Sequence, residues 1–217
     1  MEMEEVKIWN ITLLLAAIAG FCDTVTFVAA DSLFSAHVTG NFIVFAYQLI
    51  NRQELHAWVK LLTFPVFVFS VMAGGRLAAN TLNKYHLLLA EGVLLCLGGI
   101  GVVVFDAVAF NEAWAMHLIA MMVVFAMGVQ NAFGKLYSKE TYGPTTMMTG
   151  NVTQAALDLG AWLKGDKPAL TSLKKQAVTI GGFLTGCVLG ALIGNYIGLS
   201  AILLPGIGMV ICYLFKS

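Results

Sequence analysis

Charged residues are scarce in this chain, and they make up only 11% of its 217 residues. A typical soluble domain is about 25% charged. Hydrophobic residues reach 59%, and the mean hydropathy is +0.84. A water-soluble protein of this length needs more polar surface than that. The composition therefore excludes an ordinary soluble domain and predicts an integral membrane protein whose partner is the lipid bilayer.

The chain also lacks an excess of positive charge and any metal-ligand spacing. Its 12 basic and 12 acidic residues give a net charge of zero, which argues against nucleic acid as a partner because phosphate binding needs concentrated positive charge. The 4 cysteines form no CxxC pattern, and no two of the 4 histidines have the i, i+4 spacing of a helical metal pair. We expect no enzyme activity, no metal and no cofactor, although heme ligation by two histidines stays open.

Apolar segments of membrane-spanning length recur along the chain, since a span needs about 20 mostly apolar residues. Five segments meet or approach that length and a sixth is shorter: 8–30, 58–80, 85–106, 113–134, 176–197 and 199–215. Two further segments, 38–50 and 148–163, look helical but are short and partly polar. The sequence predicts an all-α fold, a polytopic transmembrane helix bundle in which residues 1–217 form one domain.

The two short segments belong to a pattern that occurs twice. Each follows a Gly near the end of a long apolar segment, then a polar residue three positions later, and then an identical Thr-Gly-Asn. The polar residues are Asp23 and Asn131, and the motifs lie at 39–41 and 149–151. Downstream, one spacing is repeated: Phe67-x-x-Ser70-x-x-x-Gly74 and Phe183-x-x-Gly186-x-x-x-Gly190. We interpret the chain as an internal two-fold repeat, with repeat 1 at about 8–106 and repeat 2 at about 113–215.

Duplicated halves that meet around short or interrupted helices are typical of secondary transporters. A broken helix leaves backbone N–H and C=O groups that lipid cannot satisfy, so they must face protein or a wet cavity. The N-terminal end of a half-helix also carries partial positive charge, which suits an anion. We therefore expect short broken or half helices and a small permease for a small polar or anionic solute. A passive channel, a cofactor-binding membrane protein and a scaffold are the alternatives.

The candidate binding residues lie around the two motifs. Asp23 leads, because a carboxylate inside an apolar helix costs about 2.5–3.5 kcal/mol and often serves ion or proton movement. The alternative for Asp23 is a structural hydrogen bond to the backbone of Thr39 or Asn41, and for the other polar residues it is capping or helix packing. The expected substrate or ion site comprises Asp23, Thr39, Gly40, Asn41, Gln130, Asn131, Thr145, Thr146, Thr149, Gly150 and Asn151.

Other polar residues have open or structural roles. Glu91 is either an intramembrane acid or a partner of Lys84 or Arg76 near the interface. Asp158 is expected to be structural, on the wetter face of the second short segment. His37, beside the first motif, is the one histidine considered for the site.

Glycines repeat every fourth residue near the C-terminus, at Gly182, Gly186, Gly190 and Gly194. Such a small-xxx-small stripe allows close helix packing in lipid. We expect packing within the molecule, with a homodimer as the alternative because a bundle this small has little room to enclose a path alone.

Lysine and arginine placement bears on topology. If all eight segments cross, the basic residues divide 8 to 4. If the two short segments are re-entrant, they divide 10 to 2, with only Arg52 and Lys60 on the minority side. We favour the second arrangement, which has six crossings and inverted halves. Both place the N- and C-termini in the cytoplasm, and the acidic start does not resemble a secretory signal.

The motifs GFCDTVTFV…HVTGNFIVF and AMGVQNAFGK…TTMMTGN resemble those of the DUF1275 family, also called the YoaK-like membrane proteins. The resemblance extends from about residue 12 to 213. It implies an Asp at the first site, matched by Asp23, and Gln-Asn at the second, matched by Gln130 and Asn131. It further implies a bacterial integral membrane protein of the kind often described as a permease.

Overall fold

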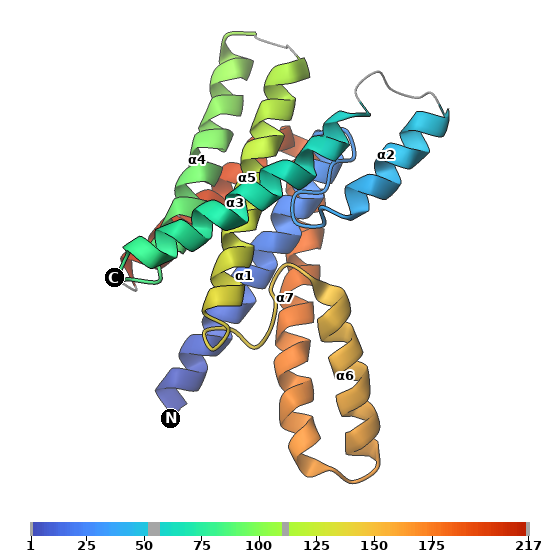
Figure 1. Cartoon of the computed structure of the whole chain (residues 1–217), viewed down its shortest axis with the longest axis vertical. Coiled ribbons are helices and arrows are strands. Elements are labelled where there is room, and N and C mark those ends of the chain that lie inside the picture. Colours follow the sequence, from blue (N-terminus) through green and yellow to red (C-terminus); the bar gives the residue numbers. More distant parts are fainter. Residues whose placement is uncertain (1, 52–56, 110–112, 216–217) are drawn as a thin grey trace.

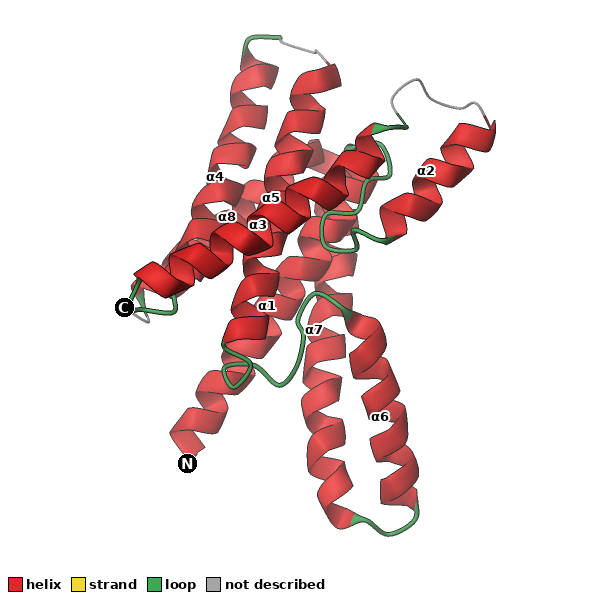
Figure 2. Cartoon of the chain, in the orientation of Figure 1, coloured by secondary structure: helices red, strands yellow, loops and turns green. Residues whose placement is uncertain are grey.

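The structure is a computed structural model that describes residues 2–51, 57–109 and 113–215. Every element in these ranges is a helix, as Figure 2 shows. In chain order they are α1 (Glu2–Ala29), α2 (Gly40–Asn51), α3 (Val59–Asn80), α4 (His86–Ala107), α5 (Ala113–Leu136), α6 (Met148–Leu163), α7 (Lys167–Ile197), the 3₁₀ helix η1 (Gly198–Ile202) and α8 (Leu203–Leu214). The prediction of an all-α fold is confirmed.

Five segments of the described chain are long and apolar enough to cross a bilayer: Glu5–Ala29, Val59–Asn80, His86–Ala107, Trp114–Leu136 and Lys167–Leu214. Large apolar side chains stay exposed on these helices, for example Leu184, which is 62% exposed on α7. Soluble monomers rarely expose apolar surface on this scale. The arrangement fits a membrane protein whose outer surface is solvated by lipid.

The helix boundaries follow the predicted segments closely except at the N-terminus, where α1 begins at Glu2 rather than at residue 8, and near the C-terminus. Segment 148–163 coincides with α6, and 38–50 lies within two residues of α2 at each end. The predicted segment 176–197 is only the later part of α7, which begins at Lys167 with a proline in its first turn, a position that proline favours. The predicted segment 199–215 is divided into η1 and α8, because α7 ends at Gly198 with a positive φ of 63°.

The most extensive helix pair is α1 with α7, and glycines make it close. A Cβ atom at Gly186 would lie 2.0 Å from the carbonyl oxygen of Ala17, and one at Gly190 would lie 2.7 Å from that of Phe21. Any side chain at these positions would force the helices apart. The glycine stripe therefore packs within the molecule, as predicted, and this face of α7 is covered by α1.

A second close crossing joins α3 to α5. The Ser70 hydroxyl donates a hydrogen bond of 2.5 Å to the Phe125 carbonyl oxygen, and a Cβ atom at Gly128 would lie 2.0 Å from the Ser70 Oγ atom. Helix α4 packs against both α5 and α8. These pairs form the core of the bundle.

The two short helices lie outside this core. Helix α2 packs on α3, and α6 packs along α7. In Figure 1 they extend from the bundle in opposite directions, α2 toward the upper right and α6 toward the bottom. The segments that precede them, 30–39 and 137–147, turn back from the ends of α1 and α5 before each short helix begins. These two turned-back loops hold the candidate site.

Candidate functional site

Asp23 lies in α1 and holds the first turned-back loop. Its Oδ1 atom accepts hydrogen bonds from the backbone N–H groups of Ala36, at 2.7 Å, and His37, at 3.2 Å. Its Oδ2 atom lies 3.2 Å from Nδ1 of His37. The predicted alternative, a bond to the backbone of Thr39 or Asn41, is wrong in detail, since the loop approaches Asp23 two or three residues earlier.

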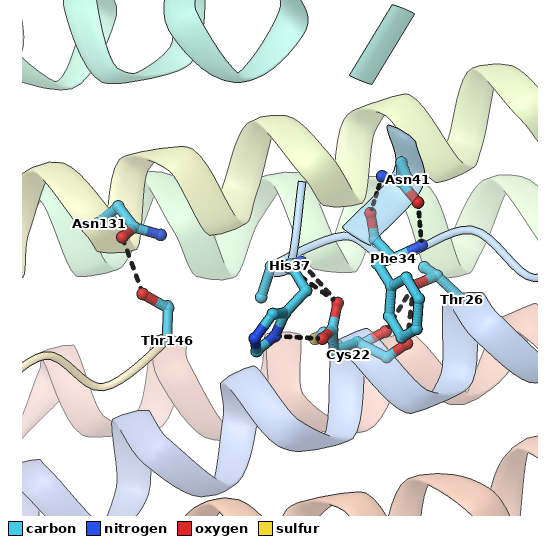
Figure 3. A network of polar contacts seen from close by, with 9 residues as sticks. Cys22, Thr26, Phe34, His37, Asn41, Asn131 and Thr146 are labelled. Carbon is cyan, nitrogen blue, oxygen red and sulfur yellow. Dashed lines mark hydrogen bonds and ion pairs between the residues drawn. The ribbon is translucent and has the colours of Figure 1, made fainter. Parts of the chain in front are cut away.

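The carboxylate and the imidazole form a pair whose members differ in exposure. The side chain of Asp23 is 6% exposed and that of His37 is 38% exposed. The hydrogen bond that His37 donates to Asp23 raises the pKa of His37 above its ordinary value, against the opposing effect of burial, because a nearby carboxylate favours the charged imidazolium. Figure 3 shows His37 directed to this carboxylate from the loop. The pair thus places a partly exposed imidazole beside a buried carboxylate.

A cavity of about 520 Å³ opens beside this pair. We call it the Asp23 cavity, and it is lined by Asp23, Thr24, Phe27, Phe34, His37, Gly40, Ile43, Val44, Phe183 and Cys187. The lining comes from α1, the first loop, α2 and α7. Apart from the Asp23–His37 pair and Thr24, the walls are apolar.

Asn41, from the first Thr-Gly-Asn, holds the same loop from its other side. Its Oδ1 atom accepts the N–H of Phe34 at 2.8 Å, and its Nδ2 atom donates to the carbonyl oxygen of Phe34 at 2.7 Å and to the Thr63 hydroxyl at 3.0 Å. Figure 3 shows this clamp between Asn41 and Phe34. Asn41 is buried and does not line the cavity, so its role is to shape the loop.

The second loop has a comparable arrangement around Asn131 in α5. The Thr146 hydroxyl donates to Oδ1 of Asn131 at 2.8 Å, as Figure 3 shows. The Nε2 atom of Gln130 donates to the carbonyl oxygen of Leu15 and to the Thr145 hydroxyl, both at 2.9 Å. An amide side chain of α5 therefore takes the place that the carboxylate takes in α1.

These residues border a second cavity, of about 280 Å³. We call it the Asn131 cavity, and it is lined by Gln130, Asn131, Gly134, Lys135, Ser138, Gly143, Pro144, Thr145, Thr146 and Met147. Lys135 is exposed, so this cavity has a cation at its edge and several hydroxyl and amide groups on its wall. It shares no lining residue with the Asp23 cavity.

Asn151, from the second Thr-Gly-Asn, clamps its loop as Asn41 does. Its Nδ2 atom donates to the carbonyl oxygen of Pro144 at 2.7 Å, and both asparagines reach back by seven residues. Pro144 has no N–H group, so the second bond that Asn41 makes with Phe34 has no counterpart here. The clamp in the second loop is therefore weaker.

Both loops lie on α7. A Cβ atom at Gly143 would lie 3.9 Å from Oε1 of Gln176, and the ring centroids of His37 and Phe183 are 6.4 Å apart. Residues 176 and 183 are two helical turns apart, which places them on one face about 10 Å from each other. Both loops therefore approach one face of α7, and the Asp23 cavity takes Phe183 and Cys187 of this helix into its lining, whereas the Asn131 cavity is lined by α5 and the second loop.

The remaining motif residues lie away from the cavities. Thr39, Thr149 and Gly150 are exposed and line neither cavity, whereas Gly40 lines the Asp23 cavity. Capping by Thr149 is also wrong, because α6 begins at Met148 and its N-cap residue, Met147, makes no side-chain cap bond. The motif builds the loops chiefly through its asparagines.

One ionic cluster was not predicted from the sequence. Lys60, in α3, is fully buried and pairs with the carboxylate of Asp31, which also lies 3.4 Å from Nε2 of Gln48. Asp31 has a positive φ of 55°. This cluster ties the start of the first loop to α2 and α3, so Lys60 has a structural role in addition to its use in judging topology. No sequence spacing indicates it, because the partners are 29 residues apart.

Glu91 does not pair with Lys84, because Lys84 forms an ion pair with Glu140 instead. Glu91 is fully buried, and neither carboxyl oxygen has a hydrogen-bond partner within the described part of the chain. It lies within the candidate membrane span His86–Ala107, and the predicted pairing with Lys84 is wrong, while its role as an intramembrane acid stays a prediction. Asp158 is also buried, rather than on a wet face, and accepts a bond of 2.8 Å from Gln154, which is a structural role.

Among the residues that the structure describes, no three His, Cys, Asp or Glu side chains lie together as a metal site. His56 and Arg52 lie outside the described residues.

Sequence reasoning missed several residues that line the cavities, chiefly Phe27, Phe34, Phe183 and Lys135. Single aromatic residues in an apolar sequence carry no signal of a cavity.

Comparison with known proteins gives one match. No curated protein and no solved structure matches the chain. Residues 11–215 match a family described as a protein of unknown function, DUF1275. The match includes Asp23, both Thr-Gly-Asn motifs and the residues of both cavities, and the chain belongs to the DUF1275 family.

Proposed function

We propose that this protein is a small secondary transporter that moves a small polar or anionic solute across the bacterial inner membrane, with protons coupled through Asp23. The observation that carries the proposal is the pair of polar arrangements that hold the two loops, one built on the Asp23 carboxylate and one on the Gln130 and Asn131 amides. Polar groups inside an apolar bundle are costly and usually mark the path of a solute or proton.

We also infer an inverted repeat, from two helix crossings that correspond. Helix α1 crosses α7 as α5 crosses α3: a Cβ atom at Gly20 would lie 2.2 Å from the carbonyl oxygen of Phe183, and one at Gly128 would lie 3.3 Å from that of Phe67. Both pairs come from the repeated sequence pattern. We infer that residues 8–106 and 113–215 are related halves, and inverted halves with a site at their interface are the architecture of many transporters.

We propose six crossings, made by α1, α3, α4, α5, α7 and η1 with α8, and two re-entrant half-helices, α2 and α6. In Figure 1 the end of α2 and the start of α3 lie toward the same upper end as the end of α1. This topology leaves two basic residues, Arg52 and Lys60, on the side with fewer positive charges. Lys60 is buried in an ion pair, so its charge is balanced and only Arg52 counts on that side. The distribution of positive charge then favours cytoplasmic termini more strongly.

The chemistry of the cavities suggests a division of roles. The Asn131 cavity has hydroxyl and amide groups and the cation of Lys135, which suit a small polar or anionic solute. The Asp23–His37 pair can exchange a proton close to neutral pH, since imidazole titrates there. We assign solute binding chiefly to Gln130, Asn131, Thr145 and Thr146, and proton binding to Asp23 with His37.

A flux assay tests this function. The full chain is reconstituted in liposomes that contain a pH-sensitive dye, and succinate, glutamate and phosphate are added outside in turn. We expect saturable uptake of at least one anion with a matching change in internal pH, and Asp23→Asn is expected to abolish the pH change. Thr149→Val, an exposed motif residue outside both cavities, is the control.

Two outcomes contradict the proposal. Flux of an anion that is saturable but identical in the wild type and Asp23→Asn removes the proposed role of Asp23. The absence of protein-dependent movement of all three anions, with correctly folded protein in the liposomes, argues against an anion carrier.

A passive channel is the second candidate, because α2 and α6 both begin at loops on one face of α7 and run in opposite directions (Figure 1). Half-helix ends that converge on a path also occur in channels. Large single-channel currents in a planar bilayer support the channel. Slow, saturating and pH-coupled flux supports the transporter.

A further inference from the structure

We propose that the Asp23 cavity is a binding site for a lipophilic phenol, a molecule with an aromatic ring, a ring hydroxyl group and a hydrocarbon tail, which enters from the lipid. This goes beyond transport of a polar solute and does not depend on it. Three features carry the inference: the aromatic walls of the cavity, the apolar surface through which it is reached, and the Asp23–His37 pair in its lining.

The walls of the Asp23 cavity are aromatic. The rings of Phe27 and Phe34 are 4.8 Å apart and tilted, and His37 meets Phe34 and Phe183 edge-on at centroid distances of 6.3 and 6.4 Å. Such aromatic side chains favour a further ring that packs against them in an offset or edge-on arrangement. A cavity of about 520 Å³ is within the range of small-molecule sites.

The cavity is reached through apolar surface. Ile43 on its rim is 75% exposed, and Phe27 is exposed as well. The neighbouring outward residues of α7, Leu184 and Val188, are exposed apolar side chains. In a bilayer these residues face lipid, so a ligand with a hydrocarbon tail reaches the cavity without crossing water. A free anion would have to give up its hydration to enter this cavity.

The Asp23–His37 pair selects the polar group of the ligand. Asp23 is occupied by two backbone N–H groups and by Nδ1 of His37. Because Nδ1 of His37 contacts Asp23, the other ring nitrogen, Nε2, is the one that can form a hydrogen bond with a ligand. It donates a hydrogen bond when the imidazole is charged and accepts one when the imidazole is neutral. A hydroxyl group does both, so a phenol matches the pair in either state.

The pair also disfavours a charged ligand. When His37 is protonated, its charge balances that of Asp23, and the cavity offers no net charge to an ion. The remaining polar side chain on the wall, Thr24, is a hydroxyl and does not change this balance. The best ligand is therefore uncharged.

The test uses two probes that differ only in the hydroxyl group, para-heptylphenol and heptylbenzene. Their binding to the full chain in lipid nanodiscs is measured by titration calorimetry, with empty nanodiscs subtracted. We expect saturable binding of one phenol per chain and about tenfold weaker binding of heptylbenzene, which corresponds to one net hydrogen bond. His37→Phe keeps an aromatic ring without the nitrogen and should weaken phenol binding about tenfold while leaving heptylbenzene unchanged.

A second variant locates the site without touching the polar pair. Cys187→Phe places a larger side chain in the cavity and should weaken both probes at least tenfold, so the site is tested even if His37→Phe disturbs the loop. Thr146→Val, in the Asn131 cavity, is the matched control and should change neither affinity. Equal affinity for the two probes, or full phenol binding by Cys187→Phe, overturns the proposal and leaves the cavity as a place for lipid chains.

Discussion

The Asp23 cavity and the Asn131 cavity are built in the same way but differ in chemistry. In each, a polar residue of a long helix holds a turned-back loop, and an asparagine of the following motif clamps that loop seven residues back. Around Asp23 the loop is held by a carboxylate and the walls are aromatic, whereas around Asn131 it is held by an amide and the wall is polar. The shared backbone arrangement therefore does not fix the chemistry of the two cavities, which is set by a few side chains in their linings.

The largest expected difference is between removal of the carboxylate and removal of the amide. Asp23→Ala leaves the N–H of Ala36 and the imidazole of His37 without their acceptor, and we expect it to lower the free energy of unfolding by about 3–5 kcal/mol. Asn131→Ala removes a neutral bond from Thr146 and is expected to cost about 1–2 kcal/mol. Unfolding in micelles, followed by circular dichroism against denaturant, measures both. Equal costs contradict the view that the first loop depends on charge.

The two clamps provide a smaller contrast. Asn41→Ala removes three hydrogen bonds, two to Phe34 and one to Thr63, and is expected to cost about 2–3 kcal/mol. Asn151→Ala removes the bond to Pro144 and a weak contact with sulfur, for about 1 kcal/mol. The same unfolding measurement applies to both. A larger cost for Asn151 shows that Pro144 does not weaken the second clamp.

The smallest expected effect is on the pH dependence of stability. Because the pKa of His37 is raised in the folded protein, its stabilising contribution is fully present below the ordinary histidine value of about 6.5 and is lost as pH rises through the folded value. Partial exposure screens the pair, so the effect should be below about 1 kcal/mol. His37→Gln should remove this part of the decline between acidic and alkaline pH. Met147→Gln, in the second loop, is the control and should leave the decline intact.

Much of the fold follows directly from the sequence. The predicted segment 148–163 coincides with α6. Polar stretches before and after this segment mark where the helix begins and ends. The start of α7 was missed, because Lys167–Gln176 is too polar to read as part of a membrane helix. It is helical because α6 packs along it, a tertiary contact that overrides the local composition.

The candidate site was predicted in part. The intramembrane position of Asp23 and its counterpart Asn131 were visible in the sequence, and both hold loops beside cavities. The threonines of the motifs were expected at the site but are exposed at the surface, because a residue pattern does not fix which side of a turn faces inward. His37 was considered for the site, but the sequence did not predict it as the partner of Asp23, since a separation of 14 residues across a loop has no characteristic spacing.

The sequence by itself determined that this protein is a helical membrane protein with two repeated Thr-Gly-Asn motifs and a carboxylate among apolar residues. Composition and periodicity carry that information because each residue must suit lipid or the helix around it. Only the tertiary structure decided that the asparagines clamp the loops, that Lys60 pairs with Asp31, and that Phe183 of α7 completes a cavity begun by α1. These contacts join residues far apart in the chain, and they depend on how closely the glycines let the helices approach.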